Sequence, residues 1–90
     1  MSVLYSRHPE LRLTAVEDEG VVLHLGSLRY FTVNETGRTI LQALEQPKTL
    51  DQLVTAVTAE YDVGDDVALQ TTQAFVARCV EAKLLEMEER

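Results

Sequence analysis

The feature that most constrains the fold is a change in hydrophobic period at Asn34. Before this residue, apolar and polar side chains alternate, as they do between Leu11 and Ala15, and a period of two predicts strands with one buried face. After it, apolar side chains recur at intervals of three and four between Leu50 and Tyr61, which predicts an amphipathic helix. A single change of period predicts an α+β fold in which a sheet precedes the helices.

Three strand-like runs lie before Asn34, over residues 11–15, 21–25 and 28–33. The turn between the first two runs ends in Gly20, and we expect Gly20 to take a positive φ there. Gly26 and Ser27 separate the second run from the third, and two residues beginning with glycine predict a type II′ hairpin. The three runs therefore predict a three-stranded antiparallel meander.

Capping residues mark the helices that follow. Asn34 is a strong N-cap for a first helix over residues 35–46, which the following proline ends. Thr49 caps the second helix, and Gln52 completes a capping box three residues later. A third helix is predicted over about residues 66–83. Its predicted apolar face consists of Leu69, Thr72, Phe75, Val76, Cys79 and Val80.

A chain of 90 residues fits one domain. We expect this domain to span residues 11–86, as a three-stranded antiparallel sheet followed by three helices in a winged-helix-like arrangement. Residues 1–10, which contain Pro9, are expected to form a flexible segment, and residues 87–90 a polar tail. No apolar run reaches the roughly 20 residues of a membrane span. The first ten residues also lack the apolar core of a signal peptide, so we expect a cytoplasmic protein.

The balance of charge bears on the class of partner. Fifteen acidic residues against eight basic ones give a formal net charge of −7. Nucleic-acid binding depends on Lys and Arg contacts with phosphates, and here the basic residues are scattered. A winged-helix DNA-binding protein stays open as an alternative, although its reading helix would offer only Arg78 and Lys83 as basic groups. The composition favours a partner with some positive charge.

The residues that usually carry catalysis or metal binding form no recognisable site. Cys79 lies in the apolar stripe of the last predicted helix, where a buried and inert thiol is expected. His8 and His24 have no Cys, Asp or Glu at ligand spacing. The glycines do not form a phosphate loop. We therefore expect no catalytic residue, no metal and no cofactor.

The third predicted strand, residues 28–33, is the strongest candidate for a working surface. It lies at the edge of the meander, contains no proline and carries Arg29 as its only charge. An unprotected edge invites pairing with another chain, and an extended peptide can add to it as a further strand. The last helix can supply the opposite wall of a groove. Within that helix Thr71 and Ala74 leave room for a ligand, or alternatively pack against another helix.

The candidate peptide-binding residues follow from this placement. They are Leu28, Arg29, Tyr30, Phe31, Thr32, Val67, Thr71, Ala74, Phe75 and Arg78. Arg29 and Arg78 are expected to pair with carboxylates of the peptide. Tyr30 and Phe31 must point to opposite faces of the strand, so only one of them can line the groove. The sequence does not decide which.

The central part of the chain resembles the PqqD-like family, the RiPP recognition elements. Members of this family show an aromatic pair, an apolar residue and Asn, followed by Thr and Gly. The matching residues here are Tyr30, Phe31, Val33, Asn34, Thr36 and Gly37. The resemblance extends over about residues 11–86. Lys83 stands where the family often has Gly, and Thr72 and Cys79 replace larger aliphatic residues.

The resemblance implies both a fold and a function. The implied fold is a three-stranded sheet packed on three helices, and the implied function is binding of the leader of a ribosomally made precursor peptide. The leader lies as an added strand in a cleft walled by the last helix. Freestanding members of this length are similar to those of lasso-peptide pathways, which present the leader to a separate cysteine leader peptidase. A PqqD-type chaperone that delivers its peptide to a radical enzyme stays open as an alternative.

Overall fold

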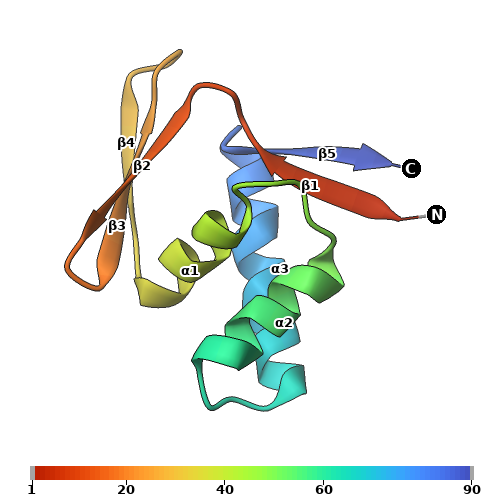
Figure 1. Cartoon of the computed structure of the whole chain (residues 1–90). Helices are drawn as coiled ribbons and strands as arrows, with labels where there is room; N and C mark the ends of the chain where they lie inside the picture. Colours follow the sequence, from red (N-terminus) through yellow and green to blue (C-terminus); the bar gives the residue numbers. More distant parts are fainter. Residues whose placement is uncertain (1, 90) are drawn as a thin grey trace.

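The computed structural model describes residues 2–89 and contains five strands and three helices in that range. The main sheet consists of three strands that precede the helices: β2 (Leu11–Val16), β3 (Glu19–His24) and β4 (Arg29–Val33). The helices are α1 (Glu35–Ala43), α2 (Leu50–Glu60) and α3 (Asp65–Glu81). The predicted α+β fold, with a three-stranded antiparallel sheet followed by three helices, is confirmed (Figure 1).

The main sheet has the order β2-β3-β4, so β4 forms one of its two edges. Both pairs of neighbouring strands are antiparallel. One face of the sheet packs on α1, and Val22 at its centre is fully buried. The other face carries Tyr30, which is 71% exposed. The sheet is therefore covered on one face only, which is why its strands alternate between apolar and polar residues.

The predicted capping residues position α1 and α2. The side chain of Asn34 accepts a hydrogen bond from the Gly37 amide at 2.9 Å. Thr49 and Gln52 form both hydrogen bonds of the capping box. Helices α2 and α3 pack together over a shared core. The core consists of Leu11, Val22, Ile40, Leu41, Leu44, Leu53, Val57, Ala68, Val76, Cys79, Leu84 and Leu85.

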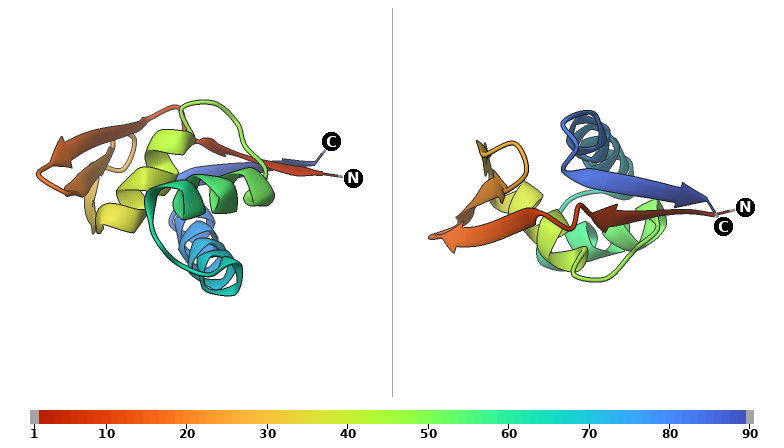
Figure 2. Two further views of the ribbon diagram at one scale, coloured as in Figure 1. Left: turned by 60° about the horizontal axis from the view of Figure 1, so that its bottom comes forward. Right: turned by 90° about the horizontal axis from the view of Figure 1, so that it is seen from above.

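A second sheet joins the two ends of the chain, and the sequence analysis did not predict it. Strand β1 (Val3–Arg7) pairs antiparallel with β5 (Leu85–Glu89), and the two lie side by side in both views of Figure 2. The expectation of a flexible segment over residues 1–10 is therefore wrong for β1, as is that of a tail outside the domain for residues 87–89. Residue 90 lies outside the described residues. Each strand is short, and its partner is at the opposite end of the sequence, so neither carries a local signal.

Both turns of the main sheet differ from the prediction. None of the glycines has a positive φ; Glu17 (φ 56°) and Leu28 (φ 57°) do. A four-residue loop, rather than a type II′ hairpin, therefore connects β3 to β4, and Leu28 closes it by donating from its amide to the His24 carbonyl at 2.8 Å. Gly20 instead lies within β3, where a Cβ would come within 3.0 Å of Val33.

Helix α3 begins at Asp65 and ends at Glu81, slightly before the predicted end at residue 83. Lys83 has φ 65°, a left-handed conformation that a helix cannot continue. The predicted apolar face is correct at Thr72 and Cys79 but wrong at Leu69, which is 36% exposed. Ala68 is buried in its place. Within the described range, no helix has the length and apolarity that crossing a membrane requires.

Candidate peptide-binding groove

A groove of about 380 Å³ separates the free edge of β4 from α3. Its wall on the β4 side consists of Phe31, Thr32, Val33 and Asn34. Its other wall consists of Phe75, Arg78, Cys79, Ala82 and Leu84. Most of these side chains are apolar, and the two aromatic rings face the groove from opposite walls. The structure thus brings the third strand of the sheet and the last helix together, as the sequence analysis predicted.

The hydrogen-bond pattern of the sheet identifies the backbone groups at the free edge. The Leu25 amide donates to the Glu10 carbonyl at 2.9 Å, so this residue of the β3 chain faces β2. Because backbone groups alternate in direction along a strand, His24 and Val22 face β4 instead. Their partners, Arg29 and Phe31, are therefore used in the sheet. Tyr30 and Thr32 direct their N–H and C=O groups toward the groove, where no described strand pairs with them.

The side chains of β4 also alternate, and this answers which aromatic residue lines the groove. Phe31 lies opposite the buried Val22 and belongs to the groove lining. Tyr30 lies opposite Leu23 on the exposed face of the sheet. The ring of Phe31 also carries the Arg29 guanidinium 5.3 Å from its centroid, a cation–π contact. Phe31 therefore contributes its side chain to the groove, whereas Tyr30 contributes only its backbone.

The wall formed by α3 differs from the predicted one. Phe75, Arg78, Cys79 and Ala82 are spaced by three, one and three residues and share one helical face. Val67 and Thr71 line a separate hollow beside Tyr61, and Ala74 lines neither hollow. These three residues therefore lie on a different face of α3 from the one that lines the groove. The sequence analysis placed Cys79 in the core alone and missed Ala82, although the spacing from Phe75 could have revealed both.

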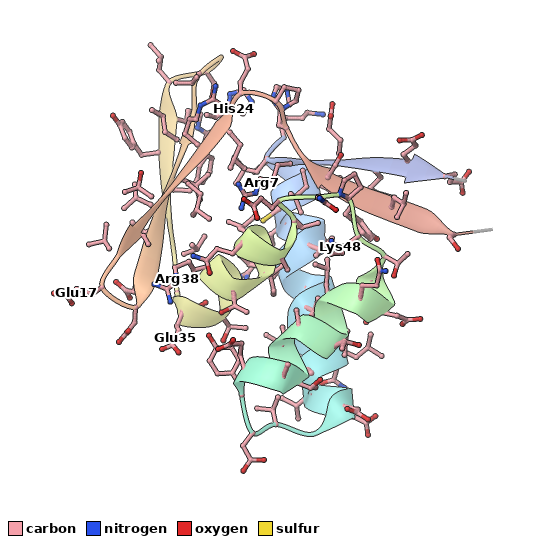
Figure 3. All side chains as sticks on the ribbon, in the orientation of Figure 1. Arg7, Glu17, His24, Glu35, Arg38 and Lys48 are labelled. Atoms are coloured by element: carbon pink, nitrogen blue, oxygen red, sulfur yellow. The ribbon has the colours of Figure 1, made fainter. Side chains whose placement is uncertain are left out.

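A second hollow, of about 600 Å³, continues the groove beyond Ala82, which lines both. Its lining residues are His8, His24, Gly26, Ser27, Arg29, Val80, Ala82, Lys83, Leu85 and Glu86. Leu28, a predicted site residue, does not line either hollow. It lies in the loop before β4 and is 72% exposed. His24 lies at this end of the sheet in Figure 3, opposite the end where Glu17 lies and Arg38 of α1 donates to its carbonyl.

Cys79 forms part of the groove floor and is only 4% exposed. Burial raises the pKa of its thiol to about 11, and the positive charge of Arg78 opposes this only in part. A thiol with such a pKa is almost entirely protonated near neutral pH and is a poor nucleophile. Among residues 2–89, no group of three or more His, Cys, Asp or Glu side chains could hold a metal ion.

Comparison with known proteins identifies the family. The family model of the coenzyme PQQ synthesis protein D, PqqD, matches residues 19–85. This chain belongs to the PqqD family. No curated protein matches it.

Two solved structures resemble the PqqD-family fold of this chain. The structure of TbiB1 in complex with the TbiA(beta) leader peptide is 28% identical, with a TM-score of 0.81, and the match covers 90% of this chain and 94% of that one. The structure of a lasso peptide synthetase B1 complexed with its leader peptide is 23% identical, with a TM-score of 0.75. That match covers 91% of this chain and 96% of the other, and it supports the fold.

The residues that carried the PqqD resemblance join the groove to α1. Asn34 lines the groove, and its side chain caps α1 by accepting a hydrogen bond from the Gly37 amide. Gly37 is buried, and a Cβ there would lie 2.8 Å from the ring of Phe75 and 3.1 Å from Val33. Only glycine lets α1 approach both walls this closely. Lys83, where the family often has Gly, adopts the left-handed conformation that glycine accepts most readily.

We expect Gly37→Ala to displace the Phe75 ring from its present position in the groove wall. The added methyl group would lie 2.8 Å from the ring and 3.1 Å from Val33, so the ring must shift to make room. The aromatic signals of Phe75 should shift in NMR spectra of the folded variant. As a control, Gly64→Ala, where nothing lies within 4 Å of the added atom, should leave these signals unchanged. An unperturbed Phe75 in folded Gly37→Ala would contradict this assignment.

Proposed function

We propose that this chain is a non-catalytic module that binds the leader of a ribosomally made precursor peptide. The leader adds as a strand to the free edge of β4 and occupies the groove beside α3. The observation that carries the proposal is the pair of outward-facing backbone units, Tyr30 and Thr32, directly beside an apolar groove. Main-chain hydrogen bonds supply affinity in such complexes, and side-chain pockets supply specificity.

The proposed binding mode is energetically reasonable. Tyr30 and Thr32 offer two donors and two acceptors, and each hydrogen bond contributes roughly 0.5–1.5 kcal/mol net. One or two apolar side chains buried between Phe31 and Phe75 add about 1.5–3 kcal/mol each. Ordering a flexible peptide costs about 2–5 kcal/mol. The upper part of the resulting range, about 8 kcal/mol, corresponds to a dissociation constant on the order of micromolar, which allows the peptide to be released after processing.

The likeness to TbiB1, solved in complex with a leader peptide, supports a leader peptide as the ligand, and the sequence resemblance to lasso-pathway members favours a lasso-peptide precursor. In this proposal the module presents the leader to a separate maturation enzyme, a cysteine leader peptidase, in the cytoplasm where the precursor is made. The PqqD family model favours a second candidate, delivery of a precursor to a radical enzyme. In either pathway the chain itself breaks no bond. DNA binding is disfavoured because α3 begins with two aspartates and has Arg78 as its single basic residue.

Fluorescence anisotropy with two probes tests the proposal. One probe is the labelled leader of a candidate precursor peptide, and the other is a DNA duplex of mixed sequence. We expect saturable, micromolar or tighter binding of the leader and no binding of the duplex at 150 mM salt. A scrambled leader of the same composition is the control. Binding to the duplex with a steep salt dependence, and none to the leader, would exclude the proposed function.

A further inference from the structure

Six of the eight basic residues of this acidic chain fall into two structural groups. Three arginines donate to backbone carbonyls: Arg7 to Leu41, Arg12 to Pro9 and Leu11, and Arg38 to Glu17. These guanidinium groups stabilise the fold itself. By contrast, the side chains of Arg29, Arg78 and Lys83 form no hydrogen bond or salt bridge with any residue from 2 to 89.

These three uncommitted cations come from different elements but gather around the groove. Arg29 begins β4, Arg78 lies in the last turn of α3, and Lys83 follows that helix. Arg78 lines the main groove, whereas Arg29 and Lys83 line the second hollow beyond Ala82. All three are exposed, and Arg29 is held over the Phe31 ring. In a chain of net charge −7, this arrangement produces a local surface of opposite sign.

The other polar groups of the second hollow are mainly donors. The Nδ1 atoms of His8 and His24 accept from the backbone amides of Glu10 and Ser27. A neutral imidazole that accepts at Nδ1 carries its proton on Nε2, so each ring retains a donor. Glu86 is the one carboxylate in the lining, which also contains the two cations Arg29 and Lys83. The hollow therefore suits an anionic group better than a neutral or cationic one.

We propose that the groove selects leaders that carry two carboxylate side chains separated by one residue. One carboxylate pairs with Arg78 and the other with Lys83 and Arg29. Arg78 lines the groove and Lys83 lines the adjoining hollow, and Ala82 lines both, so the two cationic positions are neighbours. In an extended peptide, alternate residues are the nearest pair whose side chains point to the same face, about 7 Å apart. This inference rests on the proposed function and specifies the chemistry of its ligand.

The inference opposes the simplest reading of composition, in which an acidic chain takes a partner with positive charge. The charge of the whole molecule acts at long range and is screened by salt within about 10 Å. Contacts in the groove are made with specific side chains. The local cations therefore decide which peptide is retained, even though the molecule as a whole repels acidic chains weakly.

A displayed library of random 12-residue peptides, selected on the purified full-length protein, tests the proposal. We expect the selected peptides to be enriched in Asp or Glu at two positions with one residue between them. The enrichment at one position should vanish with Arg78→Gln, and at the other with the double variant Arg29→Gln and Lys83→Gln. Lys48→Gln is the charge-matched control, because Lys48 lies beside β1, away from β4 (Figure 3), and should leave both enrichments intact.

A selected peptide then gives the quantitative result. Each Asp→Asn replacement should weaken its binding to the unmodified protein about fivefold at low salt, as expected for a partly exposed ion pair. On Arg78→Gln, the replacement at the matching position should have no effect. Peptides that bind in the groove without acidic enrichment would overturn this inference and leave the proposed function standing. Failure to select any peptide would overturn both.

Discussion

Thr32→Pro is expected to weaken leader binding by about 10- to 100-fold while the protein stays folded. The Thr32 amide points away from β3, so replacing it costs the sheet no hydrogen bond. Proline is tolerated on an edge strand when its missing N–H faces outward. In the complex, however, the variant loses one main-chain hydrogen bond, and the proline ring meets the incoming strand. The loss of affinity therefore has both an energetic and a steric cause.

Two further variants distinguish an effect of the Thr32 amide on binding from an effect of its side chain and from a loss of folding. Thr32→Val keeps the amide and removes the hydroxyl, so it should bind the leader within about threefold of the unmodified protein. Phe31→Pro removes an amide that faces β3, and it should unfold or strongly destabilise the domain. The three variants together test the alternation of hydrogen bonds along β4 that we inferred from the Leu25 amide.

The measurements are leader titration and circular dichroism on the same samples. Folded Thr32→Pro with undiminished affinity would show that the leader does not pair with β4. Loss of binding in Thr32→Val as well would point to the hydroxyl rather than the strand edge. Strong unfolding of Thr32→Pro would mean that this amide serves the sheet, which would reverse the assignment of outward-facing residues.

Local signals in the sequence were sufficient for most of the fold. Asn34 and Thr49 could be read as caps because the donors they satisfy lie within the next three residues. The period-two runs located all three strands of the main sheet. The two short strands at the chain ends, Val3–Arg7 and Leu85–Glu89, could not be found this way. Their stability comes from a pairing between residues more than 75 positions apart, and no local pattern records it.

The location of the site was predictable from the sequence, but the full set of its lining residues was not. The edge of β4 followed from strand order and the absence of proline, and the groove lies beside it. On the facing wall, Phe75 and Arg78 line the groove as expected, whereas Val67, Thr71 and Ala74 were assigned one helical row away because their small side chains suggested space for a ligand. The register of α3 is set by Ala68 and Thr72 packing inward; the pattern placed Thr72 on this face but gave Leu69 the place that Ala68 takes. Tertiary packing, rather than local pattern, fixed which row faces β4.

Cys79 should be alkylated about 100-fold more slowly than an ordinary thiol at pH 8. Its pKa is raised from 9.0 to about 11 by burial, so the reactive thiolate fraction falls by about two orders of magnitude. Because the thiolate fraction rises until the pH passes the pKa, the alkylation rate should keep climbing toward pH 11. An exposed thiol would level off about two pH units earlier. Denaturant should restore the fast rate, and this comparison is the internal reference.

Bound leader should slow the alkylation of Cys79 by a further factor of about ten or more. The thiol lies on the groove floor, between Phe75 and Ala82 in the lining, so an occupant covers its approach from the groove. The readout is unambiguous because the chain has a single cysteine. The protection should be lost in Thr32→Pro at the same peptide concentration, which links strand addition to occupancy of the groove. A leader that binds tightly yet leaves the alkylation rate unchanged would occupy a different surface, and the groove between β4 and α3 would not be its site.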